Sequence, residues 1–182
     1  MSQIKLIPTK LKGKVSVPPS KSLAHRAIIA ASLAKGISRI DHIEYSQDIK
    51  ATIGAMEALG TIIEQHEDYL IINGNYTFTK NNTMPGVQID CEESGSTLRF
   101  MVPISLAKEN KVRFIYRENV LDLNVVGELK PDLYRIPGNI SSQFITGLLF
   151  ALPLLSFDSI IEITTPLESK GYIDLTLQVL KL

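Results

Sequence analysis

Two basic residues stand where a helix disfavours them, at the start of the stretch VPPSKSLAHRAIIAASLAKG, residues 17–36. Ser20 has the features of an N-cap, and the Ala-rich apolar segment after it predicts a helix. A helix start carries about half a positive charge and offers unpaired N–H groups, so it favours acids over Lys21 and Arg26. An anion bound there would make both residues its partners, with Ser22 on the same face as Arg26. The alternative is a solvent-exposed basic helix start with ordinary capping.

A second expected helix start, NISSQF, carries more polar side chains than capping requires. One hydroxyl suffices as a cap. Ser141, Ser142 and Gln143 supply two hydroxyls and a carboxamide, which could bind phosphate oxygens alongside the free N–H groups. The alternative is that these side chains serve only capping and solubility.

Two further helix starts give weaker indications of a ligand. In EESGSTLRF, Gly95 removes a side chain where a ligand could approach the backbone, and Arg99 follows it by one helical turn. The two acidic residues before Gly95 fit the helix dipole without any ligand. At the last expected helix, Ser169 fits an ordinary cap and Tyr172 fits a half-buried position.

The bulk composition argues against several other kinds of site. The 19 basic and 19 acidic residues balance, which disfavours a nucleic-acid-binding protein driven by electrostatics. Cys91 is the single cysteine and the three histidines share no ligand spacing, so neither a disulfide framework nor a metal site is expected. The N-terminus lacks the apolar core of a signal peptide, and the longest apolar run, 144–155, is too short to span a bilayer. We therefore expect a soluble cytoplasmic protein that binds neither nucleic acid nor membrane.

Apolar periodicity, capping residues and turn signals predict a mixed α/β (α+β) protein with short strands and better-marked helices. Helices are expected near 21–34, 47–59, 96–107, 142–153 and 170–181. Strands are expected near 3–7, 14–17, 37–43, 61–66, 69–73, 86–90, 111–116, 122–126, 132–136 and 159–164.

Three segments are similar to one another, which predicts three copies of one βαβαββ-type unit. They are PPSKSLAHRAIIAASLAKG, EESGSTLRFMVPISLAKEN and PGNISSQFITGLLFALPLL. Ser94 follows Ser20 by 74 positions, whereas Ser141 follows Ser94 by only 47, so the middle copy is short by about 27 residues. Near residue 120, where its second helix should begin, the sequence has no helical period, and the third copy reaches Leu182 without its closing strands. The units are expected at about 19–90, 91–136 and 137–182, the middle one shortened and the last one truncated.

A pseudo-threefold arrangement of these units could point several helix starts at one place. Such a rim would concentrate N–H donors, hydroxyls and positive potential. It would suit a small molecule with several negative charges.

The motifs PPSKSLAHRAIIAASLAKG, ESGSTLRF, IPGNISSQFITGLLFALPLL and LESKGYIDLTLQVL resemble the 5-enolpyruvylshikimate-3-phosphate synthase (3-phosphoshikimate 1-carboxyvinyltransferase) family, in order and over nearly the whole chain. The resemblance implies an enolpyruvyl transferase-like fold, an inside-out α/β barrel domain that is incomplete here. It assigns 19–182 to the shikimate-phosphate-binding domain and 1–18 to strands of a second domain otherwise missing. The implied reaction transfers enolpyruvyl from phosphoenolpyruvate to the 5-hydroxyl of shikimate 3-phosphate, in the shikimate pathway toward chorismate and aromatic amino acids, without metal or organic cofactor.

The same resemblance implies roles at the end of the site that holds the carboxylate and the reacting groups. Ser22 and Arg26 would hold the shikimate carboxylate. Lys21 would lie between the two substrates, near the reacting oxygen, as the one catalytic candidate. Gly95 would abut phosphoenolpyruvate, where a larger side chain would crowd it.

At the other end, the resemblance implies a phosphate site. Ser141, Ser142 and Ser169 would bind the 3-phosphate, Gln143 would touch both ligands, and Tyr172 would line the shikimate pocket.

Departures from the family pattern limit what this chain is expected to do. No segment like the R-x3-R-P motif follows KVRFIY, where the middle copy is short, and the family's further domain with its acidic base is not in the sequence. We therefore expect a substrate-binding half that needs a C-terminal domain and is inactive alone. The alternatives are a non-catalytic anion-binding fragment and the related UDP-N-acetylglucosamine enolpyruvyl transferase, which lacks the pair K-S-x3-R and S-S-Q-F.

Overall fold

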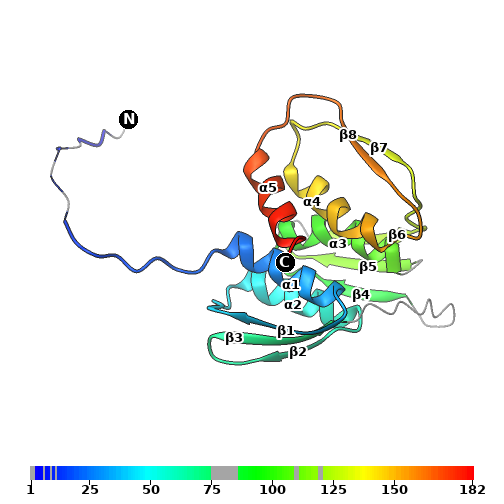
Figure 1. Ribbon diagram of the computed structural model, residues 1–182, viewed down its shortest axis with the longest axis horizontal. Helices are drawn as coiled ribbons and strands as arrows, with labels where there is room; N and C mark the ends of the chain where they lie inside the picture. The colour runs from blue at the N-terminus through cyan, green and yellow to red at the C-terminus, as the bar shows by residue number, and fades with distance from the viewer. Residues whose placement is uncertain are drawn as a thin grey trace.

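A computed structural model describes residues 3–5, 7–8, 10, 12–74, 86–108, 111–118 and 121–182 (Figure 1). Its helices are α1 (Lys21–Leu33), α2 (Gln47–Ala58), α3 (Gly95–Lys108), α4 (Ser142–Ala151), the short 3₁₀ helix η1 (Leu152–Leu154) and α5 (Lys170–Val179). Its strands are β1 (Gly36–Asp41), β2 (Ile62–Gln65), β3 (Tyr69–Gly74), β4 (Val87–Asp90), β5 (Lys111–Tyr116), β6 (Leu121–Val126), β7 (Leu133–Ile136) and β8 (Ile160–Ile163).

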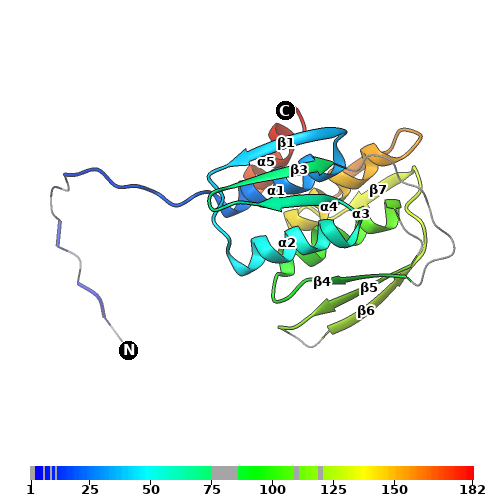
Figure 2. The same ribbon diagram turned by 90° about the horizontal axis from the view of Figure 1, so that it is seen from below.

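The strands form three separate sheets, and the helices lie between them (Figures 1 and 2). The sheets have the orders β1-β3-β2, β4-β5-β6 and β7-β8. β4 pairs in parallel with β5 across α3, and β7 pairs in parallel with β8 across α4, because a helix is the usual connection between parallel neighbours. The described part of the chain therefore has the expected mixed α/β architecture, and its sheets do not join into a closed barrel.

Strands β4 and β7 each pair with a strand that follows them in the chain. β4 belongs to the sheet of the middle unit and β7 to the sheet of the last one. Each of these two strands precedes the helix that carries the chain to its parallel partner, whereas the expected boundaries at 91 and 137 leave it in the preceding unit; these boundaries stay a prediction. As predicted, no helix among the described residues separates β5 from β6, which pair as antiparallel neighbours. The chain path through residues 119–120 lies outside the described residues.

The strands expected before α1 are not formed. Residues 14–17 carry no regular structure, and neither do the described residues within 3–7. The segment extends away from the rest of the molecule (Figure 1), and Val15 and Val17 are exposed. Alternating apolar residues form a strand only when another strand satisfies their backbone groups, so this prediction from local pattern was wrong. That residues 1–18 belong to a second domain stays a prediction.

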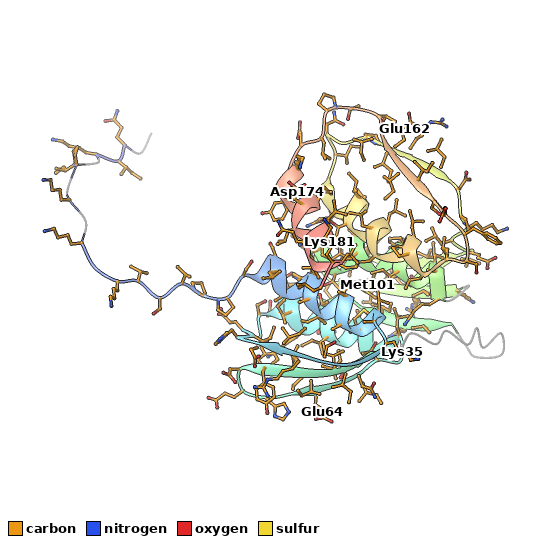
Figure 3. The ribbon with its side chains drawn as sticks, viewed as in Figure 1. Lys35, Glu64, Met101, Glu162, Asp174 and Lys181 are labelled. Atoms are coloured by element: carbon orange, nitrogen blue, oxygen red, sulfur yellow. The ribbon has the colours of Figure 1, made fainter. Side chains whose placement is uncertain are left out.

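The core lies where the helices meet the inner faces of the sheets. Met101 of α3 is fully buried among the helices, whereas Glu64 and Glu162 lie on the outer faces of their sheets (Figure 3). Alternation along the strands produces this division, since successive side chains point to opposite faces. The helices are thus held on an inner surface that fixes where each of them begins.

Helices α3 and α4 approach closely at a glycine and a proline. A Cβ added to Gly147 would lie 2.7 Å from Pro103 Cγ, 2.8 Å from the Arg99 carbonyl oxygen and 3.1 Å from that of Phe100. Pro103 has no N–H to donate to the Arg99 carbonyl one turn earlier in α3. Helix α4 packs against this carbonyl at Gly147. The glycine therefore allows contact between the two helices that carry Arg99 and Gln143.

We expect Gly147→Ala to lower the free energy of unfolding. Overpacking costs typically about 1–3 kcal/mol, which exceeds the roughly 0.5–1 kcal/mol that alanine gains over glycine inside a helix. Urea denaturation measures the difference. Gly54→Ala on α2 is the matched control, because a Cβ there meets nothing within 4 Å and should stabilise the protein. An equal increase in the free energy of unfolding in both variants would contradict the close approach of α3 and α4.

Candidate functional site

A pocket of about 550 Å³ opens where α1, α3, α4 and α5 begin. These four helix starts lie on the side of the molecule from which the N-terminal segment leaves (Figure 1). The pocket is lined by Lys21, Ser22, His25, Arg26, Ser96, Arg99, Phe100, Ile140, Ser141, Ser142, Gln143, Ser169 and Tyr172. Eight of the nine residues predicted from the sequence are in this set, and the expected gathering of helix starts is confirmed. Gly95 is not in the set, although its neighbours Ser96 and Arg99 are.

Arg26 lies at the buried side of the pocket and is held by neutral groups. Its side chain is only 3% exposed. Nε donates to Thr176 Oγ1 at 2.8 Å, Nη1 to the Ser22 carbonyl at 2.7 Å and Nη2 to Thr146 Oγ1 at 3.4 Å. Burial lowers its pKa, and it forms no ion pair with any described residue. A buried guanidinium without a counter-charge is costly, so this position favours a bound anion.

Two aromatic rings restrict the Arg26 guanidinium further. Its central carbon lies 5.5 Å from the centroid of the Phe100 ring and 5.7 Å from that of Tyr172. These contacts are within the range of cation–π attraction. Together with the hydrogen bonds to α4 and α5, they fix the direction in which the arginine can bind a ligand.

The three serines differ in how far capping explains them. Ser141 is a true N-cap, since its hydroxyl accepts from the Gln143 amide at 3.2 Å. Ser169 precedes α5 with a left-handed φ of 55°, and its side chain makes no capping bond. Ser142 is buried in the first turn of α4. Capping alone therefore accounts for Ser141 but leaves the hydroxyl of Ser169 without a local role, at a backbone conformation that L-residues rarely adopt.

Lys21 has a protein partner that the sequence interpretation missed. Its Nζ donates to Asp48 Oδ2 at 2.6 Å, across the starts of α1 and α2, and its side chain is still 57% exposed. Burial would raise the pKa of Asp48, but hydrogen bonds from Lys21 and Ser94 outweigh it and lower that pKa. The sequence did contain one sign of this ion pair. Asp48 is an acidic residue in the first turn of α2, a position that the helix dipole also favours.

A chain of buried polar groups runs from His25 through the three helices α1, α2 and α3. His25 Nδ1 lies 2.7 Å from Thr52 Oγ1, which lies 2.8 Å from Thr97 Oγ1, which donates to Ser94 Oγ at 2.8 Å. Burial is the main cause that lowers the pKa of His25 to about 4, so the ring is neutral at pH 7. Its buried Nε2 has no hydrogen-bond partner among the described residues. The network fixes the helix that carries Lys21 and Arg26.

We expect the free energy of unfolding to decrease as the pH falls from about 6.5 to about 4. In that window the unfolded chain binds a proton at His25 that the folded chain does not bind, so stability rises with pH, by up to about 1.4 kcal/mol per pH unit. Urea denaturation at several pH values measures the slope. His25→Asn should flatten it between pH 4.5 and 6.5, and an unchanged slope in that variant would assign the effect to other groups.

Gly95 is at the start of α3, but its nearest neighbours are protein atoms. A Cβ there would lie 2.7 Å from Arg99 Nη1 and 3.3 Å from Tyr116 Oη. The expected contact with phosphoenolpyruvate stays a prediction. The structure adds a reason for glycine that the sequence did not provide, because the Arg99 side chain folds back over it.

The described residues contain no group of three or more His, Cys, Asp or Glu placed to hold a metal ion. None of the described helices has the length and apolar character needed to cross a bilayer. The pocket lining itself carries hydroxyl, amide, ammonium and guanidinium donors.

This chain is similar to some known proteins in sequence and to others in fold. The sequence profile of EPSP synthase (3-phosphoshikimate 1-carboxyvinyltransferase) matches residues 6–115. A 3-phosphoshikimate 1-carboxyvinyltransferase of Clostridioides difficile is 51% identical over 212 residues, covering 100% of this chain and 48% of that protein. One of Clostridium perfringens is 51% identical over 206 residues, with the same coverage. An EPSP synthase from Acinetobacter baumannii has the same fold, with a TM-score of 0.68 at 19% identity over 86% of this chain and 42% of that chain.

Two features of these matches bear on the shortened middle unit. The chain spans about half the length of the curated relatives it matches. The alignments are longer than the 182 residues of this chain, so the relatives carry residues inside the matched region that it lacks, and their position in the middle unit stays a prediction. By sequence over its whole length and by fold, the chain belongs to the EPSP synthase family.

Proposed function

We propose that the pocket binds shikimate 3-phosphate, and that the chain is the shikimate-phosphate-binding half of a 3-phosphoshikimate 1-carboxyvinyltransferase. One observation carries the proposal. Arg26 is a buried cation at the pocket wall with no acidic partner among the described residues. An anionic ligand would supply the missing charge, and membership of the EPSP synthase family supports shikimate 3-phosphate as that ligand.

The two ends of the pocket suit the two anionic groups of that ligand. The carboxylate binds at Arg26 and Ser22 on α1, because a planar guanidinium matches a carboxylate. The 3-phosphate binds at Ser141, Ser142 and Ser169, where two helix starts add free N–H donors. The shikimate ring lies between them, beside Tyr172.

The second substrate is phosphoenolpyruvate, which binds near Lys21, Gly95 and Gln143. In the reaction the 5-hydroxyl adds to C2 of phosphoenolpyruvate while C3 gains a proton, and loss of phosphate and of a C3 proton restores the double bond. Lys21, near the reacting oxygen, is the one described pocket residue that we assign to proton transfer at that oxygen, and we assign none to the C3 proton. The reaction belongs to the shikimate pathway, and a cytoplasmic location is part of this proposal.

A non-catalytic anion-binding module is the second candidate, favoured by a pocket whose described lining has hydroxyl and guanidinium groups but no carboxylate. It shares the pocket and the ligand class with the first candidate. The two differ only in turnover, so binding has to be tested first.

Calorimetric titration of the 182-residue chain with shikimate 3-phosphate tests the proposal. We expect saturable binding with one site per chain and weaker binding of shikimate, which lacks the phosphate. Ser142→Ala should weaken binding of shikimate 3-phosphate about tenfold, as expected for one lost hydrogen bond to a charged group. Ser156→Ala, on an exposed loop after η1, is the matched control. No saturable heat, or equal affinities in both variants, would reject the assignment.

A further inference from the structure

Arg99 and Gln143 connect α3 to α4 at the rim of the pocket. Arg99 Nη1 donates to Gln143 Oε1 at 3.1 Å and to the Gly95 carbonyl at 3.0 Å. Gln143 Nε2 donates to Ser96 Oγ at 2.7 Å. Both ends of the carboxamide are therefore held by side chains from the first turns of α3.

These contacts determine which way the carboxamide points. A guanidinium has only donors, so the amide end that faces Arg99 must be the oxygen. The NH₂ end then faces Ser96, and one of its two N–H bonds remains after the bond to Ser96 Oγ. Since Gln143 lines the pocket, it offers a ligand an N–H donor rather than an oxygen.

Gly95 provides the space in which Arg99 makes this contact. The position of a Cβ on Gly95 would be 2.7 Å from Arg99 Nη1, closer than any ordinary contact. A methyl group there would displace the guanidinium and with it the bond to Gln143. The ring of Phe144, 5.8 Å from the Arg99 guanidinium, supports the same placement from α4.

We propose that Arg99 is a positioning residue that orients the Gln143 carboxamide for anion binding, and that residue 95 is glycine so that Arg99 can do so. The inference rests on the proposed function for the identity of the anion. Without Arg99, the carboxamide can rotate by 180° and turn its oxygen toward an anionic ligand, which repels it. Gly95 and Arg99 thus act on the ligand through the same amide group.

A double-mutant cycle tests whether Arg99 acts through Gln143. Calorimetry with shikimate 3-phosphate should show a loss of about tenfold for Arg99→Met and for Gln143→Met. The double variant should bind no more weakly than Gln143→Met alone. Additive losses would overturn the proposal, because they would mean that Arg99 acts on the ligand independently. Arg113→Met is the control, since this exposed arginine on β5 pairs with Asp122 away from the pocket.

The side-chain amide resonances of Gln143 give a readout that does not need a ligand. In ¹H–¹⁵N spectra of the whole chain, Arg99→Met and Gly95→Ala should shift these resonances, and Arg99→Lys should shift them less than Arg99→Met. Gly95→Ala should cause no further shift when residue 99 is already methionine. Unshifted resonances, or a full Gly95→Ala effect without Arg99, would reject the proposal. If wild-type protein fails to bind shikimate 3-phosphate but these shifts are coupled, the proposed function fails while the orientation of Gln143 stands.

Discussion

Arg26→Met is expected to weaken binding of shikimate 3-phosphate by at least about 100-fold while leaving the free energy of unfolding unchanged or higher. The loss follows from two hydrogen bonds between a guanidinium and a carboxylate, each worth about 1.5–3 kcal/mol, since about 1.4 kcal/mol is tenfold in affinity. A gain in stability together with a loss of binding distinguishes a ligand-binding cation from a structural one.

The stability of this variant follows from the groups around Arg26. In the folded protein the guanidinium is buried without a counter-charge, which costs free energy that an apolar side chain of similar length does not cost. The hydroxyls that it leaves keep other partners. The Oγ1 atoms of Thr146 and Thr176 lie 3.2 Å apart, and Thr176 Oγ1 donates to the Tyr172 carbonyl at 2.8 Å. Methionine can adapt its shape to the vacated space.

Two further variants control this experiment. Arg26→Lys keeps a charge but not the planar fork, so it should retain part of the affinity. Arg39→Met removes an exposed arginine on β1 that pairs with Asp41, and it should bind normally. Calorimetry measures binding and urea denaturation measures stability. Normal binding by Arg26→Met would show that the buried cation serves the fold alone, and the proposed site would be wrong.

The 182-residue chain is expected to give no measurable enolpyruvyl transfer, even where it binds shikimate 3-phosphate. Among the described residues that line the pocket, none is a general base matched to neutral pH. His25 is neutral, but its pKa of about 4 makes it a weak base, and its Nε2 is buried. Lys21 is paired with Asp48, and the pKa of that carboxyl is lowered. The pocket can therefore still bind and orient shikimate 3-phosphate, but no described pocket residue is suited to remove the C3 proton.

Phosphate release in the presence of both substrates measures this activity. A full-length relative, such as the Clostridioides difficile protein, serves as the positive control under the same conditions. Phosphate release by the 182-residue chain that depends on both substrates and disappears in Lys21→Met would contradict the expectation. It would also mean that the residues described here supply the proton transfers.

The sequence by itself determined the local elements and most members of the site. α1 was expected at 21–34 and is observed at Lys21–Leu33, because N-caps, apolar periodicity and closing glycines act within a few residues. The excess of hydroxyls at 141 and 142 and the basic start of α1 were visible for the same reason. Similarity between three helix starts then predicted that they would meet.

Only the tertiary structure decided which of these groups have protein partners. Lys21 and Asp48 are 27 positions apart, and Arg26 and Thr176 are 150 apart, so their pairing depends on how whole helices pack. The burial of His25 and the Arg99 side chain over Gly95 depend on packing between elements in the same way. Residues 14–17 show the opposite case, a strand pattern without a neighbouring strand to pair with it. Local signals determine which helix or strand a segment can form. Contacts between distant segments determine which side chains are paired, buried or exposed, and these properties decide the chemistry of the pocket.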